Sequence, residues 1–284
     1  NVVFDEVYDR IDISSNYFPD STGVYDGPRL PILAVKESTY ENEYMTDKLT
    51  SHAIQFMNKQ SNATPFFLYL GYNAVHNPWQ AEKKYYDRLS NIKDEYMRVQ
   101  ASLIACADEN IGILLNYLEN RKLIDNTIIV FVSDNGPAKG GPELKTWEGY
   151  DPSFEYVFGQ MKTLRGHKVD LYEGGIRTPM IIAYKPLLRE GKVFRDMIST
   201  LDFYPTICEM TGSEIPEGTT LDGVSLVRYL REETKQQPHD MLFWCRNNFG
   251  AARMGVWKLY KESDKTELYN LREDIGETKD VSAE

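Results

Sequence analysis

An apolar run that ends in a polar turn, at residues 127–137, constrains the fold more than any other stretch of this chain. Residues 127–132 are all β-branched or aromatic, which is typical of a strand buried on both faces inside a parallel sheet. Asp134 and Asn135 follow almost at once, and Gly136 with Pro137 turns the chain away. Because open parallel sheets bind ligands at the carboxyl ends of their strands, we expect a ligand site here.

The side chains of Asp134 and Asn135 determine which ligand this strand end would suit. Both offer hard oxygen atoms, which bind Ca²⁺ or Mg²⁺ better than softer metals. The alternative interpretation is an Asx turn that only caps the next segment. This stretch alone leaves both interpretations open.

Four other segments indicate the class of fold. Apolar residues recur at helical spacing over residues 44–59 and 95–121, and short apolar runs at 66–72 and 180–184 favour strands. The order strand, helix, strand from residue 66 to 132 is typical of a crossover unit in a parallel sheet. We therefore expect an α/β fold, with a mostly parallel sheet flanked by helices.

The last fifty residues have a different pattern. Residues 236–239 resemble a linker, and the segments 241–245, 251–260 and 267–271 favour short antiparallel strands. The sequence thus predicts an α/β domain over residues 1–235 and a small β-rich subdomain over residues 236–284.

Composition excludes some classes of partner. The net charge of −11 argues against nucleic-acid binding, which needs a basic surface. No apolar stretch reaches the roughly 18 residues that a transmembrane helix needs. The three cysteines, Cys106, Cys208 and Cys245, form no C-x-x-C pair and hence no zinc pattern.

Two further polar positions lie next to predicted strands. His76 follows the 66–72 run, and Lys168 lies in a loop with Glu173, Gly174 and Arg177 before the 180–184 run. For His76 the alternative is an ordinary hydrogen-bonding loop residue. For the loop, one interpretation is a solvated surface segment. The other is a segment for ion pairing or anion binding, since paired glycines permit close backbone approach and a lysine, an arginine and a glutamate lie near the strand.

These segments, taken in order, resemble the type I (formylglycine-dependent) sulfatases of the alkaline-phosphatase-like superfamily. The likeness lies in residues 66–78, 108–118, 125–136, 164–180, 201–206 and 267–277, and it runs from about Tyr44 to the end of the chain. Six motifs in the family's order are far more specific than any one of them.

The resemblance implies a sulfuric ester hydrolase that acts on a sulfated sugar or an aryl sulfate. Asp134 and Asn135 match the family's metal ligands, for Ca²⁺ or alternatively Mg²⁺, while His76 and Lys168 match residues that contact the sulfate group. Lys168 would act as a point charge, and His76 as a donor or general acid to the leaving alcohol. An extracytoplasmic location (periplasmic, secreted or lysosomal) is implied by the family alone.

The chain also departs from the family pattern. The family's nucleophile lies in a Cys-x-Pro-x-Arg motif that is converted to formylglycine, and none of the three cysteines here has that context. The resemblance therefore covers the C-terminal part of a sulfatase, with formylglycine expected in an N-terminal part, and we expect the isolated chain to be inactive. Alternatives are a phosphate or phosphonate monoester hydrolase and a non-catalytic sulfated-glycan-binding protein. Arg246, Asn247 and Asn248 are either pocket residues of such a protein or ordinary surface residues.

Overall fold

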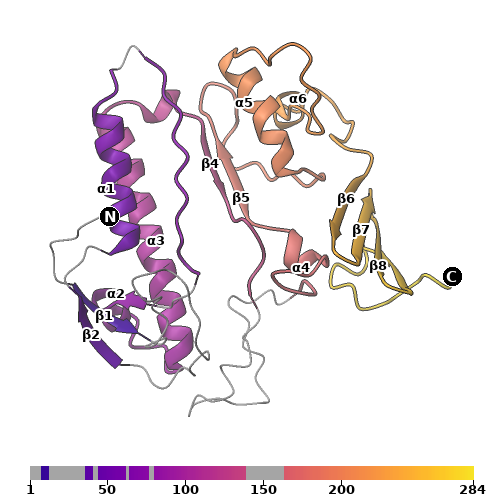
Figure 1. Ribbon diagram of the computed structural model, residues 1–284. Helices are drawn as coiled ribbons and strands as arrows, with labels where there is room; N and C mark the ends of the chain where they lie inside the picture. The colour runs from indigo at the N-terminus through magenta and orange to yellow at the C-terminus, as the bar shows by residue number, and fades with distance from the viewer. Residues whose placement is uncertain (1–7, 13–35, 41–43, 62–63, 77–79, 139–162) are drawn as a thin grey trace. The chain divides into compact units, whose positions relative to one another are not determined.

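The computed structural model describes residues 8–12, 36–40, 44–61, 64–76, 80–138 and 163–284 (Figure 1). The chain divides into two compact units. Unit 1 contains Asn1–Ile124 and Gly140–Tyr156, and unit 2 contains Asp125–Lys139 and Val157–Glu284. The sequence suggests a surface segment over residues 1–35 and an active-site loop over about 137–161, and most of both lies outside the described residues.

Unit 1 is built around two helices. The predicted helices are confirmed as α1, Met45–Asn58, and α3, Glu95–Asn120, which lie side by side (Figure 1). The carboxylate of Asp94 caps α3 by accepting a hydrogen bond from the amide of Met97 at 2.7 Å. The remaining elements of unit 1 are β1 (Tyr8–Asp12), β2 (Lys36–Tyr40), β3 (Gln80–Glu82) and α2 (Lys83–Arg88), with strand order β2-β1-β3.

The strand predicted over residues 66–72 is not formed. The backbone has neither helix nor turn there, and burial alternates as in a strand, with Phe67 and Tyr69 72% and 85% exposed. No strand among the described residues pairs with it, however, and a strand requires ladder hydrogen bonds to a neighbour. The apolar pattern correctly predicted an extended backbone with alternating burial, but it could not show whether a neighbouring strand would pair with it.

The run at residues 127–132 forms β4, Ile129–Val132, but its surroundings differ from the prediction. It pairs with β5, Met180–Ala183, in an antiparallel ladder that sets Ile129 opposite Ala183. Phe131 and Val132 are 44% and 37% exposed, so the expected burial on both faces is wrong. All strand pairs among the described residues are antiparallel, and the expected parallel crossover is absent from that part of the chain.

Short helices precede and follow β4 and β5 along the chain. They are η1 (Ile124–Asn126, at the junction of the units), α4 (Glu173–Ile176), η3 (Thr200–Asp202), α5 (Phe203–Thr211) and α6 (Val227–Leu230). Asp202 is fully buried at the start of α5. Its carboxylate accepts hydrogen bonds from the amides of Ser199 and Val224 at 2.7 and 2.9 Å, and it lies 2.9 Å from His239 Nε2. This carboxylate therefore joins three separate segments of unit 2.

The C-terminal region is an antiparallel sheet, as predicted. Its strands follow in the order β6 (Leu242–Arg246), β7 (Phe249–Met254), β8 (Trp257–Glu262) and β9 (Lys265–Asn270). The single strand expected over residues 251–260 is two strands, because Gly255 has a φ of 56° and turns the chain between them. The boundary at residue 235 stays a prediction.

The sheet shares an apolar core with the loop that carries Lys168. Leu171 and Tyr172 of that loop pack with Ala251, Tyr260 and Tyr269 of the sheet. The rings of Tyr172 and Tyr260 stack with centroids 4.2 Å apart. The lysine-bearing loop is thus positioned by strands that lie about 80 to 100 residues later in the chain. Among the described residues, no helix has the length and the apolar character that a membrane span needs.

Candidate functional site

Two segments that the sequence marked separately are joined by backbone hydrogen bonds. We call residues 133–137 the Asp134 turn and residues 164–177 the lysine loop. The amide of Lys168 donates to the carbonyl of Pro137 at 2.7 Å, and the amide of Gly136 donates to Gly175 at 2.9 Å. The amide of Ser133 donates to the carbonyl of Pro179, just beyond the loop, at 3.1 Å. The end of β4 and the lysine loop therefore form one continuous site in unit 2.

Glycines make this approach close. A Cβ added to Gly136 would lie 1.8 Å from the carbonyl oxygen of Gly174, far inside van der Waals contact. A Cβ on Gly174 would in turn lie 2.3 Å from the carbonyl oxygen of Gly166. The paired glycines of the loop thus permit the close backbone approach that the sequence suggested.

The predicted site residues fall into both units. Asp134, Asn135 and Lys168 lie in the joined segments of unit 2, with Asp134 exposed and the other two half-buried. Among the described residues, the Lys168 ammonium and the Asp134 carboxylate have no ion pair, so both charges are available to a ligand. His76 lies in unit 1, exposed, where its amide donates to the carbonyl of Asn73 at 2.8 Å. The joined segments therefore unite Asp134, Asn135 and Lys168, and His76 belongs to the other unit.

The lysine loop is held by a buried charge network that the sequence did not reveal. Lys258 of β8 is fully buried, and its Nζ lies 3.1 Å from Glu173 Oε1 and 3.0 Å from Glu277 Oε1. Glu173 also pairs with Arg253 at 3.2 Å and with Arg177 at 3.4 Å. Glu173 and Arg177 thus help to hold the loop together. Lys258 and Glu277 have no local signal, because their partners are distant in sequence.

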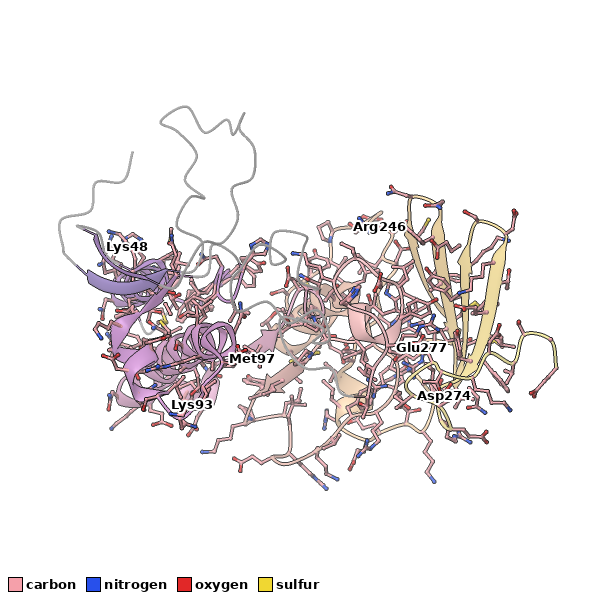
Figure 2. All side chains as sticks on the ribbon, turned by 90° about the horizontal axis from the view of Figure 1, so that it is seen from below. Lys48, Lys93, Met97, Arg246, Asp274 and Glu277 are labelled. Atoms are coloured by element: carbon pink, nitrogen blue, oxygen red, sulfur yellow. The ribbon has the colours of Figure 1, made fainter. Side chains whose placement is uncertain are left out.

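Electrostatics within this network follow from burial. Burial raises the pKa of the Glu277 carboxyl, and the Lys258 ammonium and the Glu173 amide, which donates to Glu277 at 2.7 Å, work in the opposite direction. Lys258 is therefore the main charge that opposes the rise of the Glu277 pKa in the interior. Glu277 is labelled in Figure 2 beside the C-terminal sheet.

Arg165 forms a second connection between the lysine loop and the C-terminal segment. Its Nη1 donates to the Tyr269 hydroxyl at 2.7 Å and to the carbonyl of Glu277 at 2.9 Å. Its guanidinium also lies 3.9 Å from the ring centroid of Tyr172, in cation–π contact. Burial raises the pKa of Tyr269 to about 12, so its hydroxyl remains protonated in neutral solution.

The donor atoms of the Asp134 turn fit a hard divalent cation in type. A carboxylate and a carboxamide oxygen are ligands that Ca²⁺ and Mg²⁺ prefer. Ca²⁺ takes roughly six to eight oxygens, so two side chains supply only part of a coordination sphere. The exposed carboxylate of Asp134 is free to contribute to that sphere, since it makes no ion pair among the described residues.

A second cluster of ligand-type side chains lies in unit 1. Asp47, Glu82 and Cys106 have ligand atoms within 4.8 Å of one another. Lys84 already pairs with Glu82 at 3.2 Å and with Asp47 at 3.6 Å. Burial and the two carboxylates raise the pKa of the Cys106 thiol to about 12, which opposes the thiolate that a metal would need. This cluster is an internally satisfied polar contact of the unit 1 core.

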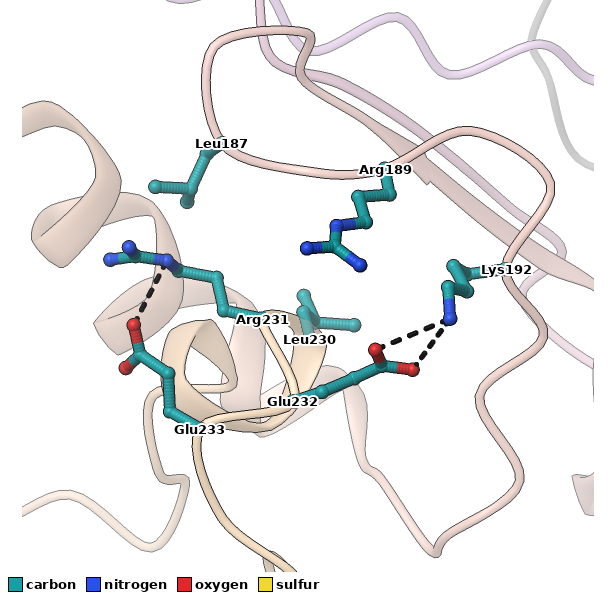
Figure 3. A pocket seen from close by; sticks show the side chains of 7 residues that line it. All are labelled: Leu187, Arg189, Lys192, Leu230, Arg231, Glu232 and Glu233. Carbon is teal, nitrogen blue, oxygen red and sulfur yellow. Dashed lines mark hydrogen bonds and ion pairs between the residues drawn. The ribbon is translucent and has the colours of Figure 1, made fainter.

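A pocket of about 210 Å³ lies elsewhere in unit 2, between the segment after β5 and the end of α6 (Figure 3). Its charged lining residues pair with one another, Lys192 with Glu232 at 2.9 Å and Arg231 with Glu233 at 3.0 Å. None of the predicted site residues lines this pocket.

Comparison with known families is consistent with the site and the fold. The family model described as Sulfatase matches residues 1–213, and the model described as N-sulphoglucosamine sulphohydrolase, C-terminal, matches residues 167–284. The fold is the α/β architecture of the alkaline-phosphatase-like superfamily with a small antiparallel C-terminal sheet. The chain belongs to the sulfatase family.

Curated relatives support this membership. The chain is 31% identical over 248 residues to the uncharacterized sulfatase YdeN of Escherichia coli (strain K12), covering 84% of this chain and 40% of the relative. It is 27% identical over 232 residues to the N-acetylgalactosamine-6-O-sulfatase of Bacteroides thetaiotaomicron, covering 81% and 42%. The chain thus spans less than half the length of these relatives.

Solved structures show the same fold. The structure of Ps i-CgsB in complex with k-i-k-neocarrahexaose has a TM-score of 0.72 and 29% identity, covering 96% of this chain and 60% of that one. The phosphonate monoester hydrolase of Agrobacterium radiobacter has a TM-score of 0.63 and 17% identity, covering 85% and 57%. The latter likeness shows the fold alone.

Proposed function

We propose that this chain is the sulfate-recognising part of a sulfuric ester hydrolase that acts on sulfated carbohydrates. The observation that carries the proposal is the backbone pairing of the lysine loop with the Asp134 turn. The bond from the Lys168 amide to Pro137, at 2.7 Å, joins the segment that carries this lysine, which has no ion pair among the described residues, to the turn that carries Asp134 and Asn135. In this proposal a lysine and a metal site lie on two hydrogen-bonded segments. Their positive charges would complement the negative oxygens of a tetrahedral sulfate ester.

The chain's own residues have distinct tasks in this proposal. Lys168 places a point charge on the sulfate oxygens as negative charge develops on them. Asp134 and Asn135 hold Ca²⁺, or alternatively Mg²⁺, which when bound neutralises sulfate oxygens as a Lewis acid. His76 donates a proton to the leaving alcohol. The buried Glu173 network keeps the loop in place.

Catalysis requires a nucleophile that none of the three cysteines supplies, since none lies in a Cys-x-Pro-x-Arg motif. Binding and electrostatics without a nucleophile retain about 10³-fold acceleration at best. We therefore expect the 284-residue chain to bind sulfate and a divalent cation but to release no sulfate from an ester. Metal-dependent sulfate release by the purified chain would contradict that expectation. An extracytoplasmic location is part of the proposal and follows from the family only.

Binding can be tested on the chain directly. Sodium sulfate is titrated into the chain in the presence of Ca²⁺, with sodium chloride at matched ionic strength as the blank, and binding is followed by NMR. Lys168→Ala is expected to weaken sulfate binding by about ten-fold or more. Lys185→Ala, which alters an exposed lysine of the same unit that pairs with Asp125, is the control and leaves binding unchanged. Equal losses in the two variants would refute the role of Lys168.

A second candidate, from the same superfamily, is a phosphate or phosphonate monoester hydrolase. The structural likeness to the phosphonate monoester hydrolase supports this second candidate, because the same fold also carries phosphonate ester hydrolysis. Side-by-side turnover of nitrophenyl sulfate and nitrophenyl phosphate by the complete gene product separates the two. If the complete gene product turns over neither substrate but binds a sulfated oligosaccharide, a non-catalytic glycan-binding protein is favoured instead.

A further inference from the structure

Arg246, which the sequence left between a pocket residue and an ordinary surface residue, contacts the backbone next to Lys168. Its Nη1 donates a hydrogen bond to the carbonyl oxygen of Val169 at 3.0 Å. Arg246 is the last residue of β6, and the two-residue connection 247–248 leads into β7. The side chain, labelled in Figure 2, thus reaches from the C-terminal sheet to the lysine loop.

The residue that accepts this hydrogen bond has an unusual backbone conformation. Val169 has a φ of 82°, in the left-handed region that β-branched side chains strongly disfavour. The amide of Asp170 donates to the carbonyl of His167 at 2.9 Å, so residues 167–170 form a hydrogen-bonded turn. Lys168 has no positive φ, and a turn with a left-handed third residue only is a type II turn. Glycine or asparagine normally occupies that third position.

A strained turn persists only where its surroundings determine it. The amide of Lys168 is fixed by Pro137 on one side, and the carbonyl of Val169 is fixed by Arg246 on the other. Without Arg246, the Val169–Asp170 peptide loses its hydrogen bond to the C-terminal sheet, and the strained turn can relax toward a conformation with a negative φ at Val169. The ammonium of Lys168 lies at the end of a four-carbon side chain. A small rotation of the backbone at Lys168 therefore moves the charge farther than it moves the backbone itself.

We propose that Arg246 is a positioning residue, which holds Val169 in the left-handed conformation and thereby aims Lys168 at the sulfate site. The proposal rests on the proposed function for the task of Lys168, but the hold on the turn stands independently of it. Arg246 contacts the turn and not the substrate.

The experiment has one readout for each of these two parts. For the turn, NMR of the labelled 284-residue chain records the intraresidue amide–Hα cross-peak of Val169, which is strong only at positive φ, and the amide shift of Lys168. For the anion, inorganic sulfate is titrated in the presence of Ca²⁺. Arg246→Ala is expected to weaken the Val169 cross-peak and to lower sulfate affinity by about three- to ten-fold. Arg246→Lys, which keeps a hydrogen-bond donor, is expected to reduce the cross-peak and the sulfate affinity by less.

Two further variants separate positioning from general damage. Val169→Gly in the Arg246→Ala background removes the steric cost of a positive φ, so most of the lost affinity should return. Arg272→Ala is the matched control, because Arg272 is exposed in the same unit and its guanidinium makes no hydrogen bond with the described residues. It should leave both readouts unchanged.

Three outcomes decide the matter. An unchanged Val169 cross-peak in Arg246→Ala would overturn the proposal, whatever happens to sulfate affinity. A relaxed turn whose affinity is not restored by Val169→Gly would also overturn it, because Arg246 would then contact the anion itself. A relaxed turn in a chain whose wild type binds no sulfate would support the hold on Lys168 and refute the proposed task of Lys168.

Discussion

The substitution Lys258→Met tests the buried network that fixes the lysine loop. The Lys258 side chain is fully buried, with the carboxylates of Glu173 and Glu277 at 3.1 and 3.0 Å. The Glu173 carboxylate keeps Arg253 and Arg177 after the substitution, whereas the Glu277 carboxylate keeps, among the described residues, only the amide of Glu173. Removing one partner of a buried ion pair costs about 3–5 kcal/mol. At roughly 2–4 °C per kcal/mol, we expect the melting temperature of unit 2 to fall by about 6–20 °C.

The pH dependence of this loss has a definite sign. Burial raises the pKa of Glu277 in the native protein, and Lys258 opposes the rise. A raised carboxyl pKa contributes stability that is fully present below the unfolded pKa and is lost as the pH rises through the folded pKa. Without Lys258 the folded pKa rises further. Lys258→Met should therefore cost less at pH 5 than at pH 8, as measured by urea unfolding at both values.

Two other variants make the test specific. Adding Glu277→Gln to Lys258→Met removes the stranded charge and keeps an acceptor for the Glu173 amide, so at least part of the stability should return. Lys261→Met changes an exposed lysine of the same strand and should stay within about 0.5 kcal/mol of the wild type. If Lys258→Met is no more harmful than Lys261→Met, or if its cost grows on acidification, the network does not hold the loop.

Three further predictions concern other parts of the chain. Gly136→Ala places a Cβ 1.8 Å from the carbonyl oxygen of Gly174 and should destabilise unit 2 by about 3 kcal/mol in thermal unfolding, whereas Gly112→Ala, with open space around it, should not destabilise the chain. His239→Ala removes the side chain 2.9 Å from the buried Asp202 carboxylate and should cost about 1–3 kcal/mol; a loss no larger than that of the exposed Gln237→Ala would contradict this. In the folded chain at pH 8, alkylation followed by mass spectrometry should modify the exposed Cys245 first. Buried Cys106, whose pKa is raised to about 12 by burial, should react only after denaturation.

Local patterns predicted those parts of the fold that local forces determine. Helical spacing predicted α1 and α3 almost to the residue, and alternation with turn residues predicted the C-terminal strands. The strand expected at residues 66–72 failed because pairing depends on a partner, which no local pattern supplies. Likewise, the period of β4 could not reveal that β5 would be its antiparallel neighbour, or that Phe131 would be exposed.

The candidate site was predictable in its residue types but not in its support. Asp134, Asn135 and Lys168 stood out because their chemistry is unusual beside apolar runs, and the structure joins their segments by backbone bonds. Their roles stay a prediction. Lys258 could not be found in the same way, since a lysine flanked by Trp257 and Leu259 normally indicates an exposed position. Its burial is explained by its ion pair with Glu173, which lies 85 residues earlier in the chain.

The contacts of the lysine loop cross the boundary that the sequence predicts at residue 235. The loop shares its core with β7, β8 and β9 through Tyr172, and it is tied to the C-terminal segment by Arg165 and by the Lys258 network. A family model that matches residues 167–284 begins within this loop. A boundary at residue 235 would separate elements that unit 2 places together. Since each link crosses that boundary, unfolding of the sheet must release the lysine loop, and the two should lose protection from hydrogen exchange together.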